Sequence, residues 1–224
     1  FHKYLSDNNM LSNCQSGFRT LHNTVITLLK STDGWRLNID KGQINGVVSI
    51  DLKKAFDIVD HSILIAKMKR YGLSEKTFNF FISYLENRNQ RCFVNNHLSQ
   101  KVAIRCGVPQ GSILGPLLFL IFINDLPNCL DVATTTMYAD DTTLTFSASN
   151  TASLKEQINN ELKRLNQWLI ANKLTLNVSK IEIMVITTRQ KRTYINDTLN
   201  IKSDHRPIHQ AKGVKMLGVQ IEQT

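Results

Sequence analysis

The sequence comprises 224 residues, of which 42% are hydrophobic and 20% are charged, enough for one large domain or two small ones with a buried core. Its 27 Lys and Arg outnumber its 18 Asp and Glu, giving a formal net charge of +9 that favours a polyanionic partner. The four cysteines show no C-x-x-C spacing and the longest apolar run, 117–123, is too short to span a bilayer, which argues against a disulfide scaffold, a zinc site and a membrane protein.

The first residues contain neither a starting Met nor an apolar segment of the kind that signal peptides carry. We therefore expect an intracellular protein, nuclear or cytoplasmic and not secreted, and a chain that is a fragment of a longer one.

The first half of the chain predicts helices that alternate with one buried strand. In that strand Ser49 and Asp51 share the polar face, because successive side chains point to opposite sides. The elements expected from periodicity and from Gly punctuation are a helix over 20–31, a polar loop through 40, a strand over 47–52 opened by Asn45-Gly46, a helix over 53–71 ended by Gly72, and a helix over 77–86.

The second half predicts two hairpins and two further helices. The elements expected are paired strands over 90–95 and 101–106, a loop over 107–111, an apolar helix over 113–126, two strands over 134–146 meeting at Asp140-Asp141, a helix with a Ser153-x-x-Glu156 capping box, and short strands from Leu174. The last helix carries an apolar stripe of Leu154, Ile158, Leu162, Leu165 and Leu169. Interleaved strands and helices predict an α/β or α+β sheet layered with helices.

Three carboxylates stand where folding alone would not favour them. Asp140 and Asp141 occupy the predicted hairpin turn, where their like charges repel, and Asp51 lies on the polar face of a hydrophobic strand. Divalent cations would remove the repulsion, and two Mg²⁺ ions about 3.5–4 Å apart can clamp the attacking and leaving oxygens of a phosphoryl transfer. The alternative for each feature alone is a solvated turn and a strand-end cap; their combination favours the two-metal site.

An ordered set of motifs resembles the core of reverse transcriptases, most closely the enzymes of non-LTR retrotransposons of the LINE and jockey type. The resemblance covers nearly the whole chain. Its motifs, in chain order, are Gln15-Ser16-Gly17-Phe18-Arg19, Asp51-Leu52-Lys53-Lys54-Ala55-Phe56-Asp57, Gly107-Val108-Pro109-Gln110-Gly111-Ser112 with its continuation to Pro127, Tyr138-Ala139-Asp140-Asp141, Leu176-Asn177-x-x-Lys180 and Leu217-Gly218-Val219.

The resemblance implies an α+β right-hand polymerase in which an antiparallel palm sheet packs on helices. Residues 1–224 would be a reverse transcriptase domain fragment, with partial fingers in 1–45 and 60–106, the palm in the rest, and no thumb. The implied reaction is RNA-directed addition of dNTPs to a primer 3′-hydroxyl by a two-metal mechanism, within a retrotransposon polyprotein. The implied partners are an RNA template, a DNA primer and dNTPs, without a membrane; the sequence leaves the oligomeric state open.

The resemblance also implies residue roles at the reaction centre. Asp51 and Asp140 would hold both Mg²⁺ ions, for which Mn²⁺ could substitute, and Asp141 would be a further ligand. Lys180 would protonate the departing pyrophosphate as a general acid, although one lysine among many also suits solvated surface.

Further roles concern the nucleotide and the primer. Phe56 would exclude a ribose 2′-hydroxyl, where a core aromatic is the alternative, and Ala55 would stay small to leave room. Gln110 would contact the incoming nucleotide beside Gly111. Arg19 would contact the triphosphate, where a structural ion pair is the alternative. Leu217-Gly218 would form the primer grip, where a plain β-turn is the alternative. The basic stretches 67–70 and 88–91 would follow the nucleic-acid backbone, and for 67–70 a stabilising position at a helix end is the alternative.

Two rival functions stay open at this point. A catalytically inactive retroelement relic could bind nucleic acid through the same fold; the intact carboxylates disfavour it, and primer extension compared with RNA binding would decide. A group II intron maturase is the second rival. The run Ser112-Ile113-Leu114-Gly115-Pro116 argues against it, and a maturase domain elsewhere in the full gene would reverse that judgement.

Overall fold

The fold is given by a computed structural model that describes residues 1–192, 199, 201–203 and 206–223. The chain forms two compact units. The first, here the helical unit, comprises Phe1–Leu11, Lys54–Asn124 and Asn172–Leu174; the second, the sheet unit, comprises Ser12–Lys53, Asp125–Ala171 and Thr175–Thr224. No helix within the described ranges is long and apolar enough to cross a membrane.

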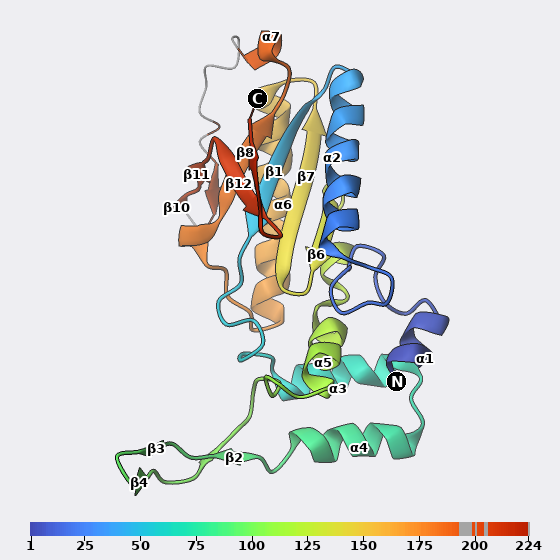
Figure 1. The fold of residues 1–224 in the computed structure, drawn as a ribbon, viewed down its shortest axis with the longest axis vertical. Coiled ribbons are helices and arrows are strands. Elements are labelled where there is room, and N and C mark those ends of the chain that lie inside the picture. Colours follow the sequence, from blue (N-terminus) through green and yellow to red (C-terminus); the bar gives the residue numbers. More distant parts are fainter. Residues whose placement is uncertain (193–198, 200, 204–205, 224) are drawn as a thin grey trace. The chain divides into compact units, whose positions relative to one another are not determined.

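The sheet unit is built on five strands in the order β11-β8-β1-β7-β6 (Figure 1). The central strand β1 pairs antiparallel with β7 and β8, β6 pairs antiparallel with β7, and only β11 is parallel to its neighbour. This largely antiparallel sheet packed on helices confirms the predicted α+β class. The strands are β1 (Ile44–Ile50), β6 (Thr134–Tyr138), β7 (Asp141–Ala148), β8 (Glu182–Ile186) and β11 (His209–Gln210).

Helices cover both faces of this sheet. On one face lies α6 (Thr151–Ala171), whose predicted apolar stripe is buried throughout. Gly46 of β1 lies under it, and a Cβ there would come within 2.9 Å of a Leu154 methyl carbon. The adjacent residue Val47 points to the opposite face, where it packs in a cluster with Trp35 of α2 (Thr24–Asp40) and with Val214.

The remaining elements of the sheet unit are short and lie mostly in its C-terminal part. The hairpin of β12 (Gly213–Met216) and β13 (Val219–Glu222) contributes Val214 and Met216 to the Trp35 cluster. The other elements are η2 (Leu126–Cys129), η3 (Val178–Lys180), α7 (Arg189–Arg192), β9 (Lys202–Ser203) and β10 (Arg206–Pro207).

The helical unit packs around α5 (Leu114–Ile123), which is buried over most of its length. The helix α3 (His61–Met68) contacts both α5 and α4 (Glu75–Leu85). An extended arm follows α4, with β2 (Asn89–Gln90) paired to β5 (Val102–Ala103) and β3 (Phe93–Val94) to β4 (His97–Leu98). The unit also contains α1 (His2–Asp7) and η1 (Lys69–Tyr71).

Several expected boundaries are wrong for local reasons. The helix expected at 53–71 begins only at His61, because Lys54 has a positive φ of 48° and Asp60 supplies the N-cap by accepting from the Ile63 amide at 3.0 Å. Its end is confirmed, since Gly72 adopts φ 64°.

Two other helices also differ from expectation. The helix expected over 20–31 runs over Thr24–Asp40 and includes the predicted loop. At the start of α6, Asn150 and not Ser153 is the capping side chain, because Asn150 Oδ1 accepts from the Ser153 amide at 2.8 Å.

Candidate active site

The backbone pairing of β1 brings two predicted site residues to either side of Asp51. Asp51 follows the last residue of β1, one position beyond the Ile50–Thr142 pair, so continuing that ladder places Asp51 opposite Asp141. On the other side, the Ser49–Glu182 pair continues in the same way to Asp51 and Lys180. The Lys180 ammonium lies 3.9 Å from Oδ2 of Asp51. The strand pairing therefore gathers residues separated widely in sequence.

The segment before Lys180 also contacts Asp51 directly. Asn177 donates from its side-chain amide to Asp51 Oδ2 at 2.7 Å, and its backbone N–H donates to the Asp51 carbonyl at 2.9 Å. The backbone N–H of Lys53 donates to the Thr175 carbonyl at 2.9 Å, so residues 175–177 extend the pairing beyond β1. Asn177 lies in one of the motifs that resemble reverse transcriptases, but the sequence analysis assigned it no role at the site.

Like charges converge on Asp141. Its pKa is raised above the ordinary aspartate value, first because surrounding protein atoms displace water from the carboxylate, then because the charges of Asp140 and Asp51 oppose its ionisation. This repulsion acts across the predicted site and links all three aspartates.

The hairpin turn lies one residue earlier than expected. Tyr138 pairs with Asp141, so the two turn residues are Ala139 and Asp140, whereas the sequence predicted Asp140 and Asp141. The positive φ of 58° falls on Ala139, a conformation that costs energy in a residue with a Cβ. A residue outside the hairpin contacts this turn, since Gln15 Oε1 accepts from the Ala139 amide at 2.9 Å, and no local sequence pattern reports such a contact.

A divalent cation fits the donor chemistry of this turn. Carboxylate oxygens are hard ligands of the type that Mg²⁺ prefers, and Mg²⁺ usually takes only one or two carboxylates and completes its shell with phosphates and water. In the part of the chain that the structure describes, no three His, Cys, Asp or Glu side chains gather closely enough to hold a metal ion by themselves. A cation here would need ligands from a phosphate-bearing substrate.

Arg19 lies in the sheet unit and holds its own loop. One guanidinium nitrogen, Nη1, donates to the carbonyl oxygens of Ser12 at 2.9 Å and Gln15 at 3.1 Å. These two bonds support a structural role for Arg19, although its partners are backbone carbonyls and not the acidic residue of an ion pair. Its contact with a triphosphate stays a prediction.

The turn of the β12–β13 hairpin falls at Leu217 and Gly218, a position that both the primer grip and a plain β-turn require. Both residues have positive φ, 50° and 87°, which matches a two-residue hairpin turn of type I′. A small cavity of about 30 Å³ lies beside it, and its lining includes Ser49, Asp141 and Lys215. The hairpin therefore borders the same end of the sheet as the carboxylates.

In the helical unit, two loops that carry predicted nucleotide-binding residues lie side by side. The amide of Val108 donates to the Phe56 carbonyl at 2.9 Å, and Gln110 Nε2 donates to Asp57 Oδ1 at 2.8 Å. The close approach requires glycine at 107, because a Cβ there would lie 2.7 Å from the Asp57 carbonyl oxygen. This contact fixes the loop that presents Gln110.

Phe56 and its neighbours have contrasting environments. The Phe56 ring stacks on Phe119 with ring centroids 4.1 Å apart, and Ala55 is buried. Gly111 has φ 82° and open space where a Cβ would be.

A cavity of about 640 Å³ adjoins these loops, and Gln110, Arg88 and Arg105 are among its lining residues. Its two arginines suit an anionic ligand.

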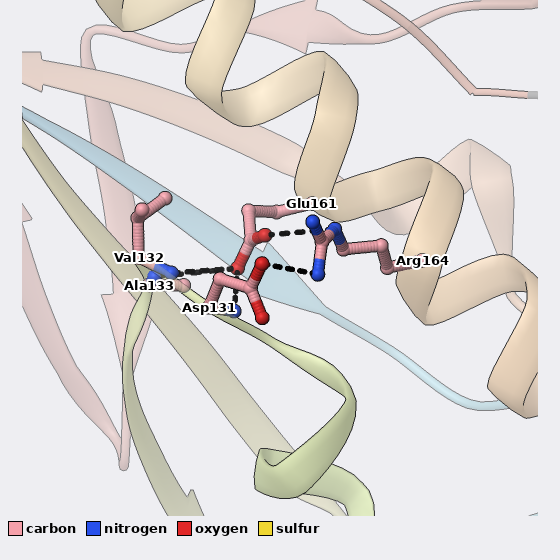
Figure 2. A network of polar contacts seen from close by, with 5 residues as sticks. All are labelled: Asp131, Val132, Ala133, Glu161 and Arg164. Atoms are coloured by element: carbon pink, nitrogen blue, oxygen red, sulfur yellow. Dashed lines mark hydrogen bonds and ion pairs between the residues drawn. The ribbon is translucent and has the colours of Figure 1, made fainter.

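A buried carboxylate that the sequence analysis missed fixes the chain before β6. Glu161 of α6, which is 2% exposed, accepts from the backbone amides of Asp131, Val132 and Ala133 at 2.9, 3.2 and 3.3 Å (Figure 2). Arg164 pairs with both Asp131 and Glu161. Since Glu161 lies beside the apolar stripe, only its burial reveals the role.

Comparisons with known proteins agree on one family. The family model described as reverse transcriptase (RNA-dependent DNA polymerase) matches residues 1–221. A probable RNA-directed DNA polymerase from transposon BS of Drosophila melanogaster is 33% identical over 73% of this chain and 19% of its own length. A probable RNA-directed DNA polymerase from the transposon X-element of the same species is 27% identical over 93% of this chain and 23% of its own.

The fold has solved counterparts. A telomerase structure from Candida albicans, in complex with a fragment of telomeric RNA, superimposes with a TM-score of 0.65 at 13% identity, over 100% of this chain and 36% of that one. The likeness concerns the fold alone. The chain spans about a fifth of the length of the two transposon relatives, as the shares of 19% and 23% indicate.

Proposed function

Since this chain belongs to the reverse transcriptase (RNA-dependent DNA polymerase) family, we propose that it forms the catalytic part of a non-LTR retrotransposon polymerase that copies RNA into DNA. The observation that carries this proposal is the position of Asp51 beyond β1, opposite Asp141 in the continued β1–β7 ladder. The backbone after the central strand thereby brings Asp51 opposite the first residue of β7, next to the turn residue Asp140.

Asp51, Asp140 and Asp141 would hold the Mg²⁺ ions of this polymerase, and Mn²⁺ could replace them. When bound, the cations activate the primer 3′-hydroxyl and neutralise charge on the triphosphate. The protein's contribution would be to hold these carboxylates at one end of the sheet, where burial of Asp141, and then the charges of Asp140 and Asp51, raise the pKa of Asp141.

Lys180 is suited to give a proton to the leaving group. In the proposed reaction the primer 3′-hydroxyl loses its proton to water as its oxygen forms a bond to the α-phosphorus, the bond from that phosphorus to the bridging oxygen breaks, and the leaving pyrophosphate accepts a proton from the Lys180 ammonium. The Lys180 side chain is 68% exposed and its ammonium lies 3.9 Å from Asp51 Oδ2. Asp51 can therefore keep the ammonium at the edge of the site.

The proposed fingers, residues 1–45 and 60–106, are divided between the two units, since 1–11 and 60–106 lie in the helical unit and 12–45 in the sheet unit. The rest of the chain would be the palm, with Leu217-Gly218 gripping the primer end. Phe56 would select deoxynucleotides, and Gln110, held by Asp57, would contact the incoming nucleotide. An RNA template, a DNA primer and dNTPs are the proposed partners, in keeping with the net charge of +9.

Extension of a DNA primer on an RNA template by the full-length protein tests the proposal. We expect Asp140→Asn to lower Mg²⁺-dependent extension at least about a hundredfold, since it removes one charged donor from the site. Asp33→Asn, at an exposed position on α2, is the matched control and should extend normally. Full activity of Asp140→Asn, or a wild-type protein that binds RNA without extending a primer, would contradict the proposal.

A further inference from the structure

The turn that carries Asp140 is held by a side chain from near the start of the chain. Gln15 Oε1 accepts from the backbone amide of Ala139 at 2.9 Å, and its Nε2 donates to the Ala139 carbonyl at 3.1 Å. The same Oε1 also accepts from the Gly17 amide at 2.7 Å. Gln15 is only 1% exposed, so water does not replace these bonds. One side chain thus satisfies both backbone groups of the residue before Asp140.

Ala139 needs such support because of its backbone conformation. Its φ of 58° brings the Cβ close to the following carbonyl oxygen, which disfavours this region for any residue other than glycine. Ala139 is also buried, and a buried backbone N–H or C=O without a partner is destabilising. The two bonds from Gln15 therefore offset part of the cost of the turn conformation that precedes Asp140.

The segment around Gln15 is itself fixed against β6. The Met137 amide donates to the Cys14 carbonyl at 2.8 Å, and the Ser16 amide donates to the Met137 carbonyl at 2.8 Å. Residues 14–17 therefore lie along the outer edge of β6. At Gly17 the approach is so close that a Cβ would lie 2.1 Å from the Ala139 nitrogen.

We propose that Gln15 is a positioning residue that holds Ala139 in its left-handed conformation and thereby directs Asp140 and Asp141 towards Asp51. Gln15 acts through the turn and touches no substrate. Only an uncharged amide of this length offers both the donor and the acceptor that Ala139 requires. The consequence for activity rests on the proposed polymerase function, whereas the effect on the turn does not.

The experiment compares Gln15→Met, which removes donor and acceptor at similar volume, with Gln15→Glu, which keeps only the acceptor. Gln167→Met, the same change at an exposed position of α6, is the matched control. Hydrogen–deuterium exchange is measured on peptides covering 137–141, and kcat and KM for dNTP are measured in primer extension by the full-length protein.

We expect Gln15→Met to accelerate exchange at 137–141 at least tenfold while α6 and β8 exchange as in the wild type. We expect its kcat to fall at least tenfold with KM changed less than threefold, and Gln15→Glu to be impaired as well. Adding Ala139→Gly to Gln15→Met should restore part of the lost kcat, because glycine adopts positive φ without the Cβ penalty.

Two outcomes would overturn the proposal. One is unchanged exchange at 137–141 in Gln15→Met; the other is faster exchange spread over α6 and β8 with no rescue by Ala139→Gly, which would mark Gln15 as a general stability residue. If Gln15→Met does not fold, the shorter amide of Gln15→Asn decides by the same measurements. Absence of extension by the wild type would contradict the polymerase function alone, since the exchange measurements would still test Gln15.

Discussion

The side-chain amide of Asn177 donates a 2.7 Å hydrogen bond to Oδ2 of Asp51. The Lys180 ammonium lies 3.9 Å from the same oxygen. Both groups reach Asp51 from the segment before β8, so the orientation of this carboxylate depends on a part of the chain far from it in sequence. Partners of this kind orient a metal-binding carboxylate without binding the metal themselves.

Asn177→Leu removes this hydrogen bond and should therefore leave Asp51 less well oriented for binding a metal ion. We expect the Mg²⁺ concentration for half-maximal primer extension to rise roughly tenfold or more, the usual effect of removing such a partner. Asn160→Leu, on the exposed side of α6, is the control for the change of residue type. An unchanged Mg²⁺ requirement in Asn177→Leu would mean that the hydrogen bond does not orient Asp51.

The raised pKa of Asp141 predicts a pH-dependent change in stability in metal-free buffer. Because the folded-state pKa lies above the unfolded one, the destabilisation is absent below the ordinary value of 3.8, grows as pH rises, and is complete above the folded-state pKa. Asp141→Asn should thus raise the melting temperature at neutral pH in chelator, and the difference should vanish in acid.

Thermal melting from acid to neutral pH, with and without Mg²⁺, checks this expectation. Mg²⁺ should stabilise the wild type more than Asp141→Asn, because the cation offsets the repulsion that the variant has already removed. Asp33→Asn should behave as the wild type throughout. A wild type that is more stable than Asp141→Asn at neutral pH in chelator would refute the argument.

The stack of Phe56 on Phe119 allows a controlled test of sugar selection. Phe56→Val removes the ring proposed to exclude the 2′-hydroxyl, so the ratio of kcat/KM for ribonucleotides to that for deoxynucleotides should rise about tenfold or more. Phe119→Leu breaks the same stack from a fully buried position. It should lower stability and change the ratio much less; equal shifts in both variants would argue against a gate at Phe56.

A substitution at Glu161 should change the stability of the fold without touching the proposed catalytic residues. Its carboxylate accepts from three backbone amides, and Glu161→Leu leaves these donors buried without their partner. The free energy of unfolding should fall by about 2–4 kcal/mol in denaturant titration. Glu156→Leu, exposed on the same helix, should change it by about 0.5 kcal/mol or less. A similar loss in both variants would indicate a helix effect and no specific role for the carboxylate.

The sequence predicts the parts of the fold that depend on short-range periodicity. The apolar stripe of α6 recurs at helical intervals, and it is buried as expected. The sequence predicts too short a helix at α2, because polar residues such as Asp33 and Asn38 interrupt its apolar pattern. The helix nevertheless continues to Asp40, and its Trp35 packs on the sheet. Tertiary packing extends the helix where periodicity is weak.

The sequence identifies the carboxylates but not how they are held. Asp140 and Asp141 attract notice because two adjacent aspartates suit a tight turn poorly. The register of that turn depends on Ala139, which carries a positive φ without being glycine, and its partner Gln15 is separated from it by 124 residues. A pairing of this range leaves no local signal, and the same holds for Asn177 and Asp51.

The central place of β1 in the sheet also has a consequence during synthesis on the ribosome. β1 is made before either of its neighbours, since Ile50 pairs with Thr142 and Ser49 with Glu182. At a translation rate of about 5–20 residues per second, β7, the first of these neighbours to be made, follows β1 after roughly 5–20 s. During that interval both backbone edges of β1 lack their strand partners and the face that α6 covers is open, so we expect wrong pairing of β1 to be most frequent before β7 emerges.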